Sequence, residues 1–170
     1  MHFDRVAVIG ISGSGKSTFA SALAAHTGLP LLHGDQLEWL ADWTLRPEPD
    51  LKALHAGWIE QPRWIIEGWM EPARVARLIA ADIVIDLDLP RSVCAWRVLV
   101  RMVRGERRTE MPIGCVDRFS WRTLRTALLR KERPYIDAAL KAATIKNYVR
   151  LCSRREAANW LTNARECWRE

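Results

Sequence analysis

The segment "VAVIGISGSGKSTFA", residues 6–20, limits what this 170-residue chain can fold into more than any other. A short apolar run ends at Gly10, and "GISGSGKS" then fits the pattern G-x-x-x-x-G-K-[ST]. Glycines in this pattern let the backbone curl so that its amides surround one anion. The pattern works only between a buried strand and a helix. The sequence therefore predicts that the fold begins with a strand, a phosphate-binding loop and a helix.

Each position of this loop has an expected contact with a nucleoside triphosphate. Lys16 is expected to reach the β and γ phosphates, and the Ser17 hydroxyl is expected to bind Mg²⁺. The positive end of the following helix adds to the attraction for phosphate. The predicted nucleotide-binding residues of the loop are Gly10, Ser12, Gly13, Ser14, Gly15, Lys16, Ser17 and Thr18. ATP and Mg²⁺ are the expected cofactors.

Apolar runs and helix-like segments alternate along the rest of the chain. The expected strands are 5–9, 31–33, 64–67, 83–87 and 148–151, with helical segments between them and a break in the segment 35–61 around 46–49. This alternation favours parallel strands joined by right-handed crossovers. The predicted fold class is α/β: a three-layer α/β/α P-loop domain, similar to nucleotide kinases, with about five parallel strands.

Length and composition favour one domain without a membrane anchor. A chain of 170 residues suits a single domain, 1–170, with a substrate-side insertion around 35–62 and a short lid around 105–117. No window approaches 18 apolar residues, and the N-terminus does not resemble a signal peptide. The four cysteines lack metal-binding spacing, which favours reduced thiols and a cytoplasmic location. A monomer or a homodimer is expected.

Two strand ends carry acids that we expect near the loop. Asp35 follows the second predicted strand, and Glu67 ends the third. Asp35 is predicted to orient or deprotonate an acceptor, and Glu67 to contact the acceptor or hold a Mg²⁺-bound water. Asp35 has the alternative role of a helix cap. Asp86 and Asp88 form a rival magnesium-binding pair.

Basic residues are concentrated in one region. Between residues 91 and 133, twelve arginines and lysines stand against four acids, whereas the whole chain has a net charge of +6. Such a region favours a polyanionic partner, and the alternative is a solvated charged face. Arg101, Arg104 and Arg108 are predicted to stabilise the transferred phosphoryl group when the segment 105–114 closes, and Arg133 to bind the nucleotide.

The acceptor side is expected between residues 35 and 77. Trp39 belongs to a group of tryptophans there that is suited to stacking on a ring, although core packing between helices is the favoured explanation of such a group. Arg46, Arg74 and Arg77 are candidates for holding an acceptor phosphate. The chain has no N-K-x-D element, and this absence argues against a guanine-reading switch protein.

With these residues in place, the chain resembles the adenylate kinase-like group of small P-loop kinases. It is most similar there to bacterial proteins labelled "DNA topology modulation protein". The resemblance rests on "VIGISGSGKST", "LPLLHGDQLEWLADW", "WIIEGWM", "RKERP" and "YVRLCSRREAANWL". It implies that Asp35 and Glu67 face the substrate and that Ser153 and Arg154 frame the adenine base. The sequence "EGWME" lacks the proline and arginine that adenylate kinases have after the third strand, so AMP is not the expected acceptor.

Two functions follow as hypotheses. The first is an ATP-dependent phosphotransferase acting on a small nucleotide-like or nucleoside-like acceptor. The second is an ATP-binding regulator of DNA topology with little or no kinase activity. In that second case Arg118, Arg122 and Arg125 would bind a nucleic-acid backbone, and binding would weaken with salt.

Overall fold

The computed structural model describes residues 3–68, 74–105, 111–112, 114–115 and 119–167, without the side chains of residues 74 and 165–167. The predicted Arg108 and Arg118 lie outside these ranges, as does most of the predicted lid. None of the described helices is long and apolar enough to cross a membrane.

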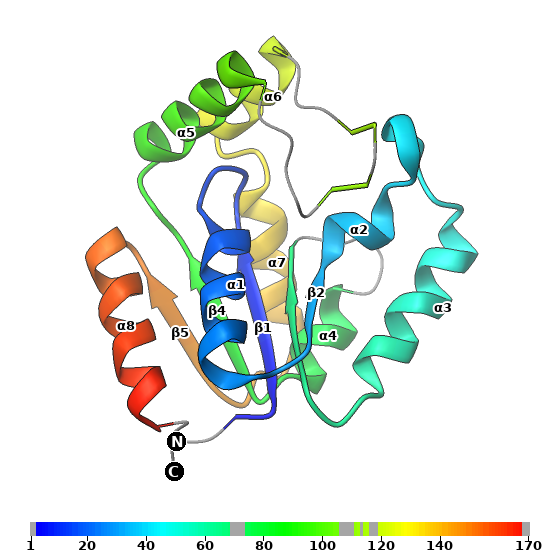
Figure 1. The fold of residues 1–170 in the computed structure, drawn as a ribbon, viewed down its shortest axis with the longest axis vertical. Helices are drawn as coiled ribbons and strands as arrows, with labels where there is room; N and C mark the ends of the chain where they lie inside the picture. The colour runs from blue at the N-terminus through cyan, green and yellow to red at the C-terminus, as the bar shows by residue number, and fades with distance from the viewer. Residues whose placement is uncertain (1–2, 69–73, 106–110, 113, 116–118, 168–170) are drawn as a thin grey trace.

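A five-stranded parallel sheet forms the centre of the domain (Figure 1). Its order is β2-β3-β1-β4-β5, which places the opening strand in the middle. The strands are β1 (Arg5–Gly10), β2 (Leu31–His33), β3 (Trp64–Glu67), β4 (Ile83–Leu87) and β5 (Tyr148–Leu151). All neighbouring pairs are parallel. The predicted α/β class is therefore confirmed.

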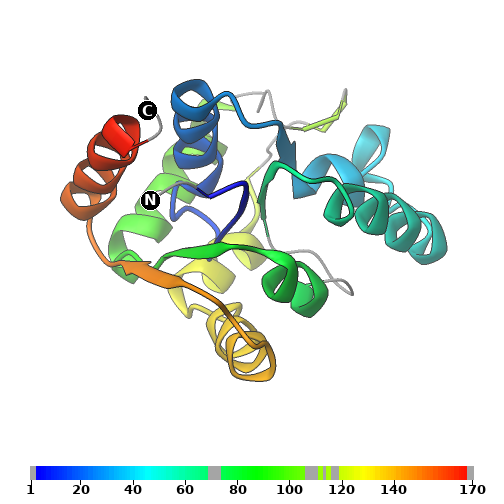
Figure 2. The same ribbon diagram turned by 90° about the horizontal axis from the view of Figure 1, so that it is seen from below.

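Helices cover both faces of this sheet (Figure 2). Helices α1 (Lys16–Thr27) and α8 (Arg154–Cys167) pack together on one side, and α4 (Arg74–Ala80) and α7 (Arg133–Ala142) on the other. The elements beyond the carboxyl ends of the strands and beside β2 are α2 (Gly34–Glu38), the 3₁₀ turn η1 (Ala41–Trp43), α3 (Glu48–Ile59), α5 (Arg91–Arg104) and α6 (Trp121–Leu128).

The strands form from short apolar runs because both of their faces are covered. Val6, Ala7, Val8 and Ile9 in β1 have no exposed surface, and Ile65, Ile66, Val84 and Ile85 in the two neighbouring strands are equally buried. Such runs suit strands buried on both faces of a parallel sheet. This packing fixes the place where β1 ends and the glycine-rich loop begins.

Local signals in the sequence set the helix boundaries. Helix α1 ends at Gly28, which adopts a φ of 68° and donates its amide to the carbonyl of Ala24. Pro90 precedes α5, and Pro49 lies in the first turn of α3. The expected helical segment 35–61 is indeed broken, into α2, η1 and α3. As a result, the acidic and aromatic residues of this segment come from three short pieces.

Candidate functional site

The loop between β1 and α1 is a tight turn that requires glycine. Gly13 and Gly15 have φ values of 79° and 92°, and the amide of Ser14 donates to the carbonyl of Ile11 at 3.1 Å. A Cβ atom on Gly13 would collide with the backbone oxygen of Cys94 on α5. The loop therefore lies directly against α5, and a side chain at residue 13 would push the two apart.

Four backbone amides of this region have no acceptor among the described residues. They are the amides of Gly13, Gly15, Lys16 and Ser17, whereas the Ser14 amide donates to the carbonyl of Ile11. Lys16, Ser17 and Thr18 form the first turn of α1, where the helix dipole favours an anion. Amides left in this state at a helix start are suited to phosphate oxygens. The donor set fits the phosphate group that the sequence predicts.

Arg97 holds the loop from α5. One of its terminal nitrogens donates to the carbonyl of Ser14 at 2.9 Å and to that of Gly13 at 3.3 Å. Burial and then the positive charge of Arg154 lower the pKa of Arg97. The guanidinium ties down two carbonyls of the loop, so that the intervening amides keep a fixed direction. Arg97 lies in the basic region between residues 91 and 133, but the sequence did not indicate that it contacts the loop.

Carboxyl and imidazole groups meet at the ends of β2 and β3. Nδ1 of His33 lies 2.8 Å from Oε1 of Glu67, and the Glu67 side chain is almost fully buried. Asp35 lies two residues beyond His33, in the first turn of α2. Burial and the nearby charge of Asp35 raise the pKa of Glu38 to about 6. The predicted pair Asp35 and Glu67 is thus found at adjoining strand ends, with His33 as an unforeseen partner.

Behind Glu67 lies a group of buried polar side chains. Oε2 of Glu67, Nε and one terminal nitrogen of Arg77, and both ring nitrogens of His55 lack a hydrogen-bond partner among the described residues. The other terminal nitrogen of Arg77 donates to the carbonyl of Gly68 at 2.8 Å. Burial lowers the pKa of Arg77 to about 10, which the charge of Glu67 partly opposes. Burial and the Arg77 charge lower the pKa of His55 to about 4, so His55 is neutral near pH 7.

The rival acids of β4 lie in a different environment. Val8 pairs with both Glu67 and Ile85, so Glu67 shares a sheet face with Ile85, and the next residue, Asp86, points to the opposite face. Asp86 accepts hydrogen bonds from Arg133 at 2.7 Å and from the Tyr148 hydroxyl at 2.8 Å. Burial raises the pKa of Asp86 against these contacts. The register thus separates Asp86 from Glu67.

Asp88 is held by three arginines. It is paired with Arg130, with Arg133 at 3.4 Å and with Nε of Arg150 at 2.8 Å. Burial alone would raise the pKa of Asp88, but the hydrogen bond from Arg150 and the charges of Arg133 and Arg130 lower it overall. The rival pair therefore has arginines where a magnesium ion would need open carboxylate oxygens.

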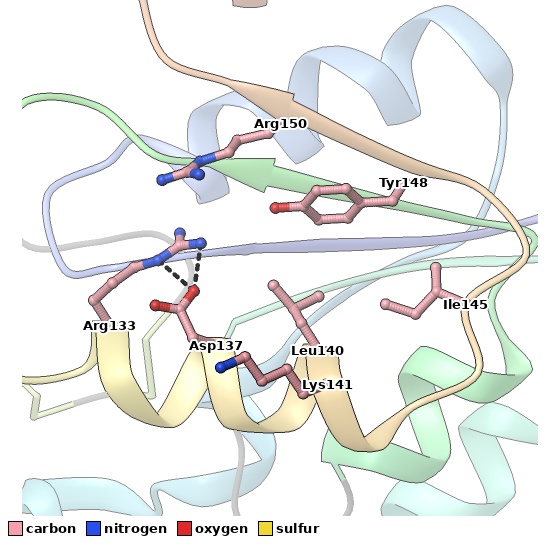
Figure 3. A pocket seen from close by; sticks show the side chains of 7 residues that line it. All are labelled: Arg133, Asp137, Leu140, Lys141, Ile145, Tyr148 and Arg150. Atoms are coloured by element: carbon pink, nitrogen blue, oxygen red, sulfur yellow. Dashed lines mark hydrogen bonds and ion pairs between the residues drawn. The ribbon is translucent and has the colours of Figure 1, made fainter.

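A pocket of about 320 Å³ lies between α7 and β5 on this face (Figure 3). Arg133 and Asp137 from α7 point toward Tyr148 and Arg150 from β5 across it. The two arginines are already engaged by Asp86, Asp88 and Asp137. The position of Arg133 is thus fixed by acids, and its predicted role in nucleotide binding stays a prediction.

The other predicted nucleotide and lid residues lie on three elements. Arg101 and Arg104 are in the last turn of α5, and Arg104 is exposed. Ser153 forms a reciprocal cap with Glu156 at the start of α8, with a Ser153 Oγ to Glu156 Oε1 distance of 3.0 Å. Arg154 is exposed in the first turn of α8, and its positive charge contributes to the lowered pKa of Arg97. The nucleotide contacts expected of these residues remain predictions.

The predicted acceptor residues lie around α2 and η1. The rings of Trp39 and Trp43 meet edge to face, with centroids 5.3 Å apart. Arg46 donates from Nε to the carbonyl of Leu37 at 2.6 Å. Arg74 begins α4, but its side chain lies outside the described residues. Trp39 and Arg46 belong to the segment that follows β2 and α2, and the binding roles of all these residues remain predictions.

The segment after α5 contacts the region around η1, on the predicted acceptor side. Sγ of Cys115 accepts from the amide of Trp43 and donates to the carbonyl of Leu40, both at 3.3 Å. Asp42 and Trp43 adopt the left-handed conformation, with φ values of 56° and 59°. Gly114 packs so closely on Asp42 that a Cβ atom would collide with the Asp42 carboxylate. The predicted insertion and the predicted lid are therefore in contact.

The sequence alone indicated no role for His33, His55 or Glu132. The folded chain brings His33 to Glu67 and Glu132 to the Ser12 amide, and it buries His55 near the charge of Arg77. For His33 a weak signal exists, because it lies two residues before Asp35 at a strand end.

The parallel sheet and the glycine loop after its central strand form an α/β fold that several kinases of solved structure share. Solved structures of that class superpose on nearly the whole chain. Shikimate kinase from Bacteroides thetaiotaomicron has a TM-score of 0.59 at 12% identity, covering 99% of this chain and 100% of that one. Shikimate kinase from Acinetobacter baumannii, in complex with shikimate, has a TM-score of 0.57 at 15% identity, covering 94% and 89%. A sugar kinase from Janibacter sp. has a TM-score of 0.54 at 20% identity, covering 96% and 92%.

At these identities the likeness concerns the fold alone. No protein-family model and no curated protein matches the chain. Membership of the DNA topology modulation family is not shown, so that resemblance stays a prediction.

Proposed function

We propose that this protein is an ATP-dependent phosphotransferase that phosphorylates a small hydroxyl-bearing acceptor, nucleotide-like or nucleoside-like. The observation that carries the proposal is the set of donors without acceptors at Gly13, Gly15, Lys16 and Ser17, held in place by Arg97. Peptide amides without partners are costly to retain unless water or a ligand satisfies them. Phosphate oxygens match this arrangement in charge and in number of acceptors.

Lys16 and the loop amides would bind the phosphate tail of ATP and stabilise the charge on the transferred group. A Mg²⁺ ion would neutralise the phosphates, and the residues that fit it are the Ser17 hydroxyl and the Glu67 carboxylate, whose Oε2 has no partner among the described residues. Arg101, Arg104 and Arg108 would add positive charge from the lid side. Arg133, Ser153 and Arg154 would complete nucleotide binding.

The acceptor would bind between the ends of β2 and β3 and the paired tryptophans. Asp35 would orient its hydroxyl or remove its proton, because a carboxylate at a strand end near the loop can accept a hydrogen bond from the attacking group. Trp39 would pack on the acceptor, and Arg46 and Arg74 would hold a negatively charged substituent. Positioning of the two reactants and stabilisation of charge supply most of the rate enhancement in such reactions.

The test is phosphoryl transfer from Mg·ATP to a panel of nucleosides, nucleotides, polyols, sugars and hydroxy acids. The last two classes enter because a sugar kinase and shikimate kinases share the fold. The Lys16→Ala variant is expected to lose ATP binding and transfer together, at unchanged thermal stability. Transfer to no acceptor, with intact ATP binding, would favour a nucleotide-binding regulator. Unchanged ATP binding by the variant would remove the phosphate-loop assignment.

A further inference from the structure

One amide of the phosphate loop does have an acceptor, and that acceptor is a charged side chain. The Ser12 amide donates to Oε2 of Glu132 across 2.6 Å, although the two residues lie 120 positions apart in the chain. By contrast, the Ser14 amide is satisfied within the loop itself, by the carbonyl of Ile11. The loop therefore binds an anionic oxygen that belongs to the protein.

The position of Glu132 is held from both sides. Arg130 pairs with Asp88, and Arg133 pairs with Asp86 and Asp88 at the end of β4, the strand next to β1. Between these two anchors, the Arg133 amide donates to the carbonyl of Arg130 at 2.9 Å, and Arg130 adopts a φ of 50°. The turn before α7 is thus fixed to the sheet, and it presents the Glu132 carboxylate at the loop.

A carboxylate oxygen and a phosphate oxygen use a backbone amide in the same way. Both are anionic acceptors, and two like charges at one small site repel each other. We propose that the Glu132 carboxylate competes with the phosphate tail of the nucleotide for the loop, so that ATP must displace it from the Ser12 amide. This inference rests on the proposed function, because it concerns the occupancy of the same loop.

Competition of this kind weakens the apparent affinity without changing the loop. A ligand that binds only one of two states has an apparent dissociation constant equal to its intrinsic dissociation constant divided by the fraction of protein in that state. Removal of the Glu132 charge should therefore tighten nucleotide binding, whereas loss of an ordinary ligand contact would weaken it. The sign of the effect separates the two roles.

The experiment is calorimetric titration of the full chain with Mg·ATP and with inorganic tripolyphosphate. Glu132→Gln keeps the size of the side chain and removes its charge. Because hydrogen bonds to charged groups contribute more than neutral ones, we expect binding about ten-fold tighter than in the wild type for both probes. Glu48→Gln is the matched control, since Glu48 is an exposed carboxylate whose ion pair among the described residues is with Lys52 on α3. The affinity of this variant should equal that of the wild type.

Thermal unfolding of each variant checks that the fold is retained, and Glu132→Ala serves as a second variant if Glu132→Gln is unstable. Equal or weaker binding by both Glu132 variants, with binding by the wild type and loss of it in Lys16→Ala, would overturn this inference and leave the proposed function standing. Failure of the wild type and of the Glu132 variants to bind either probe would overturn both.

Discussion

Glu67 at the end of β3 and Asp86 in β4 are equally buried acids, but their hydrogen bonding differs. Asp86 has both oxygens engaged, by Arg133 and by the Tyr148 hydroxyl. Glu67 has one oxygen on His33 and the other without a partner among the described residues. The two side chains point to opposite faces of the sheet. Burial alone therefore does not distinguish an acid that stabilises the fold from one that can bind a ligand.

The same contrast applies to the basic groups around them. Arg130, Arg133 and Arg150 each pair with Asp86 in β4 or with Asp88 just beyond it, whereas two nitrogens of the fully buried Arg77 have no partner among the described residues. A buried ionic group with complete partners is structural, and removing one partner leaves an uncompensated charge. A buried group with incomplete partners needs water or a ligand. The α7 face is thus expected to govern stability, and the ends of β2 and β3 to govern activity.

The largest effect on stability is expected from Asp86→Asn. Removing the charge leaves Arg133 with a weaker partner at a buried site, which should lower the free energy of unfolding by about 3 kcal/mol. Urea unfolding followed by tryptophan fluorescence measures this. The control Glu48→Gln removes an exposed pair with Lys52 and should change stability by less than about 0.5 kcal/mol. Similar values for the two variants would contradict the structural role of Asp86.

Glu67→Gln should lower activity more than it lowers stability. If Glu67 contacts the acceptor or a metal-bound water, its loss should lower kcat/KM by about a hundred-fold. Stability should fall less than in Asp86→Asn, because only the contact with His33 is weakened. Steady-state kinetics and urea unfolding on the same preparation give both numbers. A large loss of stability with normal turnover would place Glu67 in the same category as Asp86.

Arg97→Ala tests how the phosphate loop keeps its shape. Loss of the contacts to Gly13 and Ser14 should weaken ATP binding by about ten-fold, since each hydrogen bond to a charged group contributes roughly 1.5 kcal/mol or more. Arg91→Ala removes an exposed arginine from the first turn of the same helix and should have no effect on ATP affinity. Titration with ATP distinguishes the variants. Equal affinities would show that Arg97 does not hold the loop.

The smallest effect concerns the pH dependence of stability through His55. Its pKa is lowered from 6.5 to about 4 in the folded protein, so below about pH 6.5 the unfolded chain binds a proton that the folded protein does not. The free energy of unfolding should therefore fall as the pH drops toward 4, by at most about 1.4 kcal/mol per pH unit from this residue. His55→Gln should lose this contribution.

Urea unfolding of wild type and His55→Gln at about pH 7 and about pH 5 tests this difference. Glu38, whose pKa is raised to about 6, acts with the opposite sign but is present in both proteins and cancels in the comparison. Parallel pH profiles for the two proteins would show that His55 is not held neutral by burial.

The sequence predicted the glycine loop and the succession of strands and helices along the chain because those signals are local. A glycine pattern between an apolar run and a helix specifies backbone conformation within about ten residues. The pairing of Glu67 with His33, or of Ser12 with Glu132, depends on the order β2-β3-β1-β4-β5 and on its register, which no local pattern encodes. Ser153 had a local explanation as well, a capping pattern with Glu156, beside its predicted adenine contact.

The buried thiol of Cys115 joins two parts of the chain that are about 75 residues apart, through Leu40 and Trp43. An alkylating reagent can modify that sulfur only when these parts separate, because the side chain is 1% exposed. Its labelling rate, measured by mass spectrometry of the Cys115 peptide, reports how often these two parts of the chain separate. Slower labelling in the presence of a compound would identify that compound as one that keeps the two parts together.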